Sequence, residues 1–191
     1  MYDCIVIGSG FAGSTVAQQF ARQGKKVLVL EKRSHVGGNC YDRKDAHGIL
    51  IHQYGPHIFH TNSKRVYDYL SRFTEWTGYS HEVEAKVGEQ YIPVPFNLNT
   101  LEMVYGERAE VLKQKLIAAY GEGSRVPILK LKENPDADIA QIADYVYENI
   151  FLRYTMKQWG QKPEEVDRSV TGRVPVLISY DNRYFQDTYQ G

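Results

Sequence analysis

The sequence predicts an α/β fold that begins with a β-strand, a helix and a second strand parallel to the first. Two short apolar runs, residues 4–7 and 26–30, have the length and β-branched content of buried strands. Between them, apolar residues recur at helical spacing from Val16 to Phe20, and Gly24 ends this predicted helix. Strand, crossover helix and strand together form a βαβ unit, in which the two strands run parallel.

A glycine-rich turn, GSGFAG at residues 8–13, joins the first strand to the helix. Gly8 permits the tight turn, Gly10 lets the backbone approach a pyrophosphate, and Gly13 lets helix and strand pack closely. Glu31 ends the second strand, where a carboxylate accepts hydrogen bonds from a ribose hydroxyl and disfavours a 2′-phosphate. The pattern predicts a dinucleotide site and favours FAD or NAD over NADP. The alternative interpretation is a βαβ turn that binds no ligand.

Charge and composition exclude several classes of protein. The 191 residues carry 23 Lys and Arg against 23 Asp and Glu, so neither nucleic acid nor an anionic membrane is an expected partner. No apolar run is long enough to span a bilayer or to act as a secretory signal. Two cysteines, Cys4 and Cys40, are too few for a disulfide framework, which favours a reducing compartment and a cytoplasmic protein.

A second glycine pair follows Glu31 in the stretch KRSHVGGN, residues 32–39. Alone, Gly-Gly-Asn is common turn chemistry, so a plain loop is an equally good interpretation. Together with the first glycine turn, the stretch resembles the extended ADP-binding fingerprint of FAD enzymes of the amine-oxidase and sugar-mutase type.

Three histidines lie close together in residues 51–62, IHQYGPHIFHTN. The spacing of His52, His57 and His60 matches no common metal-ligand pattern, and no carboxylate or cysteine lies among them. We therefore expect no metal site, and histidines packed around a turn at Gly55 are the structural alternative.

The segment YGPHIFHTN, after the glycine turn and Glu31, resembles UDP-galactopyranose mutases. The resemblance continues along the chain through PFNLNT, YTMKQWG, RVPV and DNRYFQDTYQ, which begin at Pro95, Tyr154, Arg173 and Asp181. Motifs of this length, in this order, are highly specific.

The resemblance implies an isomerase that interconverts UDP-galactopyranose and UDP-galactofuranose through a covalent adduct on reduced FAD. NAD(P)H or another reductant would reduce the flavin, and the family allows a homodimer. The product would serve galactofuranose-containing cell-surface glycans.

The resemblance also assigns roles to residues. Arg173 and His57 are the expected catalytic residues. Arg173 is expected at the end of a mobile loop, which includes residues 161–172 and closes over the diphosphate. The expected flavin contacts are Gly8, Gly10, Phe11, Ala12, Gly13, Glu31, Lys32, Gly38, Asn39, His57, Ile58 and His60. The expected substrate contacts are Tyr154 and Thr155 at the uridine, Trp159 at the sugar, and Arg173 and Tyr184 at the phosphates.

Beyond the βαβ unit, alternating runs at residues 81–87 and 90–96 predict a hairpin around Gly88 and Glu89. Residues 107–120 and 138–153 have helical periodicity. The fold class expected is therefore α/β, a Rossmann-like FAD-binding βαβ unit with an inserted helical domain and part of a β-sheet substrate domain.

The expected division of the chain has four parts. They are the first part of the FAD-binding domain (1–78), a hairpin of the sheet domain (79–99), the helical domain (100–153) and the start of the substrate-binding sheet domain (154–191). The chain is about half as long as members of the family, so we expect a truncated chain that binds FAD poorly and is inactive alone. Two other functions stay open, an FAD oxidoreductase of the amine-oxidase or desaturase type and a non-catalytic nucleotide-binding remnant.

Overall fold

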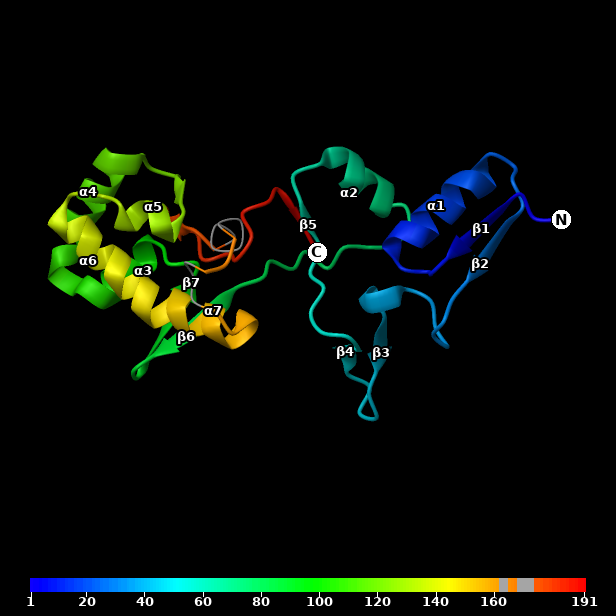
Figure 1. Cartoon of the computed structure of the whole chain (residues 1–191), viewed down its shortest axis with the longest axis horizontal. Helices are drawn as coiled ribbons and strands as arrows, with labels where there is room; N and C mark the ends of the chain where they lie inside the picture. The colour runs from blue at the N-terminus through cyan, green and yellow to red at the C-terminus, as the bar shows by residue number, and fades with distance from the viewer. Residues whose placement is uncertain (162–164, 168–173) are drawn as a thin grey trace. The chain divides into compact units, whose positions relative to one another are not determined.

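The computed structural model describes residues 1–161, 165–167 and 174–191. Contacts within this part of the chain divide it into two compact units, Met1–Phe59 and His60–Gly191 (Figure 1). The predicted boundary at residue 78 falls inside the second unit, and the four-part division stays a prediction.

The first unit begins with the predicted βαβ motif. Strand β1 (Cys4–Ile7) pairs in parallel with β2 (Val27–Leu30), and helix α1 (Phe11–Arg22) connects them (Figure 1). The structure confirms the predicted βαβ motif. The sequence could predict it because apolar periodicity and glycine breaks are local signals. Ile7 of β1 is 86% exposed, which leaves apolar strand surface without cover inside this unit.

A small antiparallel hairpin completes the first unit. A 3₁₀ turn (Gly38–Cys40) leads into β3 (Asp42–Lys44), which pairs with β4 (Leu50–His52). Asp42 and His52 are direct partners in this pairing, so both lie at the same end of the hairpin.

The second unit holds the large apolar core. Strands β6 (Val83–Val87) and β7 (Gln90–Val94) form the predicted hairpin, with Gly88 at φ +60° in its turn. The hairpin is followed along the chain by helices α3 (Leu98–Tyr105), α4 (Ala109–Tyr120), α5 (Ile128–Lys132), α6 (Ala137–Val146) and α7 (Leu152–Trp159). Fully buried residues such as Ile92, Leu112 and Ile142 join hairpin and helices in one cluster.

The helix predicted at residues 138–153 is longer in the structure than its periodicity indicated. Helix α6 continues through a π-helical turn (Tyr147–Phe151) into α7, so helical backbone extends to Trp159. A π-helical turn carries an extra residue per turn, and such turns occur often at functional sites.

Two short pairings in the second unit join segments that lie far apart in the sequence. Strand β5 (His60–Thr61) pairs with β10 (Tyr189–Gln190), while β8 (Arg125–Val126) pairs with β9 (Val176–Leu177). Helix α2 (Lys64–Leu70) follows β5. Within the described part of the chain, no helix is both long and apolar enough to cross a membrane.

Candidate functional site

The glycine-rich turn presents an open helix N-terminus. Gly10 is the N-cap of α1 and contributes no side chain, so no hydroxyl or carboxylate of the cap satisfies the first helical N–H groups. Free N–H groups and the helix dipole at such an end attract an anion. The turn can therefore bind a phosphate or a diphosphate.

Two glycines, one in the turn and one in the loop after β2, are required by close backbone contacts. A Cβ on Gly13 would lie 2.0 Å from the carbonyl oxygen of Gly8, which no side chain tolerates. A Cβ on Gly38 would lie 2.9 Å from the Cα of Gly10, so the loop after β2 comes close to the turn. The two glycine stretches that the sequence singled out are thus neighbours in the first unit.

Glu31 is fixed beside this turn. Its Oε2 accepts hydrogen bonds from the Ser9 backbone N–H (2.7 Å) and the Ser9 hydroxyl (2.6 Å), and its Oε1 accepts one from the Arg33 N–H (3.0 Å). These bonds, led by that of the Ser9 hydroxyl, lower the pKa of Glu31 to about 2. An ionised carboxylate has further lone pairs, so it can still accept a ribose hydroxyl. Together, the turn and Glu31 fit the ADP half of a dinucleotide.

The loop after β2 carries an aromatic group that the sequence did not predict. The His35 ring stacks on Tyr41 at 3.8 Å between centroids, and its Nε2 lies 2.7 Å from the Tyr54 hydroxyl. The Arg33 guanidinium lies 4.1 Å from the centroid of the Tyr54 ring and donates a hydrogen bond to Asn39 Oδ1. Lys32 lies on the same loop and is exposed.

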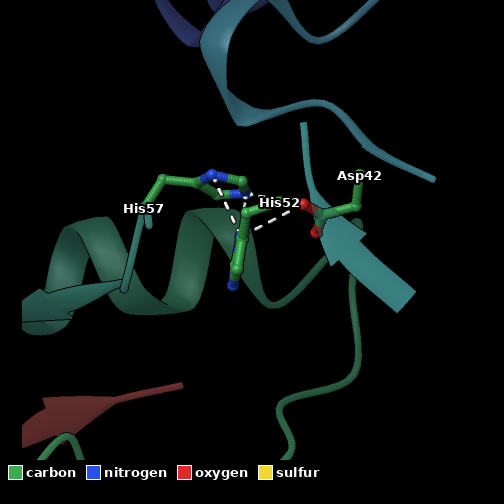
Figure 2. Close-up of side chains that lie close together, drawn as sticks. All are labelled: Asp42, His52 and His57. Carbon is green, nitrogen blue, oxygen red and sulfur yellow. Dashed lines mark hydrogen bonds and ion pairs between the residues drawn. The ribbon is translucent and has the colours of Figure 1, made fainter. Parts of the chain in front are cut away.

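Asp42, His52 and His57 come together at the end of the β3–β4 hairpin (Figure 2). Spacing could not reveal this cluster, because its carboxylate lies ten residues before His52 and reaches it only through strand pairing. His57 Nδ1 lies 3.1 Å from the Gly55 carbonyl oxygen, which orients the ring.

His60 lies in a different environment from the other two histidines. Its ring stacks on Phe185 at 3.6 Å, and its Nδ1 lies 2.9 Å from Asp187 Oδ2. The pairing of β5 with β10 makes this contact. His60 therefore belongs to the second unit, whereas the other eleven residues expected at the flavin belong to the first.

An apolar hollow of about 180 Å³ opens in the second unit. It lies between the β6–β7 hairpin, the π-helical turn and the C-terminal segment, and its lining includes Val83, Ala85, Val94, Ile150, Phe151 and Tyr184. Pockets for drug-sized ligands usually measure roughly 300–1,000 Å³, so this hollow suits one ring of a ligand.

Two expected substrate contacts lie at or near the hollow. Tyr184 lines it, and the Tyr184 N–H donates to the carbonyl oxygen of His81. Thr155 lies on α7, four residues after Phe151, and is only 3% exposed. Tyr154 and Trp159 lie on the same helix, but their side chains are outside the described part of the chain, and all of Arg173 is outside it.

Comparisons with known proteins match two parts of the chain. A family model described as "NAD(P)-binding Rossmann-like domain" matches residues 6–73, and one described as "UDP-galactopyranose mutase" matches residues 149–191. The second match begins within the π-helical turn and contains α7 and Tyr184.

Curated relatives match the chain almost from end to end. A probable UDP-galactopyranose mutase of Klebsiella pneumoniae is 35% identical over 98% of this chain and 48% of its own length. A dTDP-fucopyranose mutase of Escherichia coli is also 35% identical, over the whole of this chain and 50% of its own length. The chain thus spans about half the length of the curated relatives it matches.

A solved structure resembles the fold. The crystal structure of a reduced UDP-galactopyranose mutase superimposes with a TM-score of 0.57 at 18% identity, over 93% of this chain and 37% of the other. The Rossmann-like match includes the glycine turn and Glu31, whose geometry suits a dinucleotide. The motif order and the relatives agree with this match. Over almost its whole length the chain is similar to UDP-galactopyranose mutases, and it contains a Rossmann-like part at residues 6–73 and a mutase-type segment at residues 149–191.

Proposed function

We propose that the chain forms part of a flavin-dependent mutase that interconverts the pyranose and furanose forms of UDP-galactose. The observation that carries this proposal is the apolar hollow at the π-helical turn. Residues 149–191, which match the mutase family model, contribute five of its lining residues, Asn149, Ile150, Phe151, Val174 and Tyr184. A hollow for one ring in this segment fits the base of a nucleotide sugar.

FAD is the proposed cofactor. The N–H groups at the start of α1 would hold its pyrophosphate, and Glu31 would accept the ribose hydroxyls. When bound, the reduced flavin supplies a nucleophilic ring nitrogen for the anomeric carbon of the sugar. NAD(P)H or another reductant would reduce the flavin. The isomerisation itself consumes no net electrons.

The substrate would be held mainly by the second unit. The base would enter the hollow against Phe151, with Tyr154 and Thr155 at the uridine and Trp159 at the sugar. Tyr184 would donate its hydroxyl proton to a phosphate oxygen. Arg173 would neutralise the charge that develops on the departing diphosphate, which is the kind of transition-state stabilisation that a positioned cation provides.

His57 is proposed at the flavin, where the GPH turn would present backbone groups and the imidazole to the ring system. Gly55 holds φ +92°, so the turn has the left-handed conformation that glycine allows. The contact with the Gly55 carbonyl oxygen then limits rotation of the His57 ring.

A second substrate is supported by the relatives. The dTDP-fucopyranose mutase matches this chain at the same identity as the probable UDP-galactopyranose mutase, so dTDP-fucose is the alternative nucleotide sugar. Thymine differs from uracil by one methyl group, and an apolar hollow discriminates weakly against a methyl group.

Binding of the nucleotide tests the proposal on the chain itself. UDP and dTDP are titrated into the purified chain, into Ala85→Trp and into Lys86→Trp, with binding followed by calorimetry. Ala85 lines the hollow, whereas its neighbour Lys86 is exposed on the other face of β6, so only the first indole fills the hollow. We expect Ala85→Trp to abolish binding and Lys86→Trp to leave it unchanged. Equal nucleotide binding by both variants would show that the hollow is not part of the substrate site.

A further inference from the structure

Asp42, His52 and His57 form a compact group of three ligand-type side chains within the first unit (Figure 2). The pairing of β3 with β4 places Asp42 opposite His52, and the turn after β4 brings back His57. The three side chains are 33%, 47% and 21% exposed, so the group lies at the surface of the first unit. This group provides the carboxylate that the histidine-rich segment lacks on its own.

The three ligand atoms form a nearly equilateral triangle. His52 Nδ1 and His57 Nε2 each lie 3.1 Å from Asp42 Oδ1, and the two nitrogens lie 3.1 Å from each other. With metal–ligand distances of about 2.1 Å, two ligand atoms of one ion lie about 3.0 Å apart at octahedral angles and about 3.4 Å apart at tetrahedral angles. The observed edges lie between these values.

A hydrogen bond between the two imidazoles accounts for one edge of the triangle, and the two edges to Asp42 are ion pairs only where the imidazole is protonated. Asp42 Oδ1 is inaccessible to solvent and has no hydrogen-bond partner in the described part of the chain. Both imidazole nitrogens are near enough, but their approach lacks the geometry of a hydrogen bond to this oxygen. Neutral imidazoles offer this carboxylate oxygen no positive charge, and a carboxylate oxygen without solvent or a hydrogen bond costs free energy that a bound cation would remove.

We propose that Asp42, His52 and His57 bind a divalent transition-metal ion, with Zn²⁺ as the probe. Two imidazoles and one carboxylate on one side of an ion suit zinc and its neighbours, and leave coordination positions for water. His60 takes no part, because it is stacked on Phe185 and paired with Asp187. His57 is shared with the proposed flavin site, so the metal is measured on the chain without FAD.

The test is calorimetric titration of Zn²⁺ into the chelator-treated, FAD-free chain. We expect one equivalent to bind, with the affinity reduced about tenfold or more in Asp42→Asn. The matched control is His47→Gln, in the turn of the same hairpin and outside the triangle, which should bind as the unmodified chain does. Absence of Zn²⁺ binding, or equal loss in Asp42→Asn and His47→Gln, would overturn the proposal.

A second measurement does not depend on a variant that folds. In the unmodified chain, the imidazole ¹⁵N resonances of His52 and His57 should shift on addition of one equivalent of Zn²⁺, while those of His35, His47 and His81 stay in place. Shifts spread evenly over all histidines would show adventitious surface binding and contradict the site. Co²⁺ in place of Zn²⁺ should give a visible absorption spectrum that Asp42→Asn loses.

Discussion

The Asn97 side-chain nitrogen lies 2.9 Å from Asn182 Oδ1, which ties the PFNLNT segment to the DNRYF segment 85 residues later. Asn97 is fully buried, and its Oδ1 accepts the Thr100 N–H as the N-cap of α3. The same side-chain nitrogen donates to the Asp181 carbonyl oxygen at 3.1 Å. The Asn99 side-chain nitrogen also donates to Asn182 Oδ1, at 2.9 Å. Two segments that the sequence marks as family motifs are therefore held together by two asparagine side chains, so part of their role is structural.

Asn97→Ala should lower the free energy of unfolding by about 2 kcal/mol or more, since it removes a cap and a buried hydrogen-bonding partner. Asn182→Ala should have a smaller effect, because the cap of α3 remains. Urea unfolding followed by circular dichroism measures both. As a control, Gln114→Ala removes only an exposed hydrogen bond to Glu110 and should stay within about 0.5 kcal/mol. Equal values for Asn97→Ala and Gln114→Ala would contradict the tie.

The helical core gives a second stability prediction. Leu112 is 1% exposed within the main cluster, whereas its neighbour Val111 on α4 is 62% exposed. Leu112→Ala should cost about 2–5 kcal/mol through lost burial and the cavity that remains. Val111→Ala should change the free energy of unfolding by less than about 0.5 kcal/mol. Similar losses in the two variants would mean that α4 is packed through a different face.

The pH dependence of the first unit should follow Glu31. Its pKa is lowered from 4.5 to about 2 by hydrogen bonds that exist only in the folded chain. Its contribution to stability is therefore complete above pH 4.5 and is lost as the pH falls toward 2. Ser9→Ala removes the largest cause and should raise the pKa of Glu31 toward 4.5. The pKa of Glu31 is measured from its carboxyl ¹³C shift as a function of pH, with Ser34→Ala as the control. An unchanged pKa in Ser9→Ala would contradict the role of the Ser9 hydroxyl.

Substitution of two glycines of the turn by alanine should affect folding differently. Gly13→Ala forces a Cβ into the Gly8 carbonyl oxygen and should disrupt the βαβ unit itself. A Cβ at Gly10 would have its nearest neighbour at 3.8 Å, an ordinary contact, so Gly10→Ala should fold normally. Amide NMR spectra of the two variants separate these outcomes. A native-like spectrum for Gly13→Ala would contradict the close approach of helix α1 to the turn at Gly8.

Local signals predicted much of the fold. Strand β1, α1, β2 and the β6–β7 hairpin follow from apolar periodicity and glycine turns within short windows. Helix α3 was missed because its eight residues follow directly on the proline-rich arm of the hairpin. The pairing of β5 with β10 was also missed, because its partners lie far apart in the sequence and the strands have only two residues each.

Only the parts of the candidate site that depend on local signals were predicted from the sequence. The glycine turn and Glu31 are local features, and the structure brings them together. Tyr41, Tyr54 and Asp42 carry no signal of their own, because they join their clusters only through the β3–β4 hairpin and the loop before it. Arg173, the residue with the largest expected role in catalysis, lies outside the described residues and stays a prediction.

The most direct test of the account is a fluorescence titration of FAD into the purified chain and into Gly10→Val. All the contacts proposed for the ADP half of the cofactor come from the first unit, so the chain should quench flavin fluorescence with saturation, although the affinity is expected to be low. A valine at Gly10 places two methyl groups where the pyrophosphate must approach, and should abolish that quenching while the circular dichroism spectrum stays unchanged. No saturable quenching by the chain, or the same quenching by Gly10→Val, would contradict a dinucleotide site at the glycine turn.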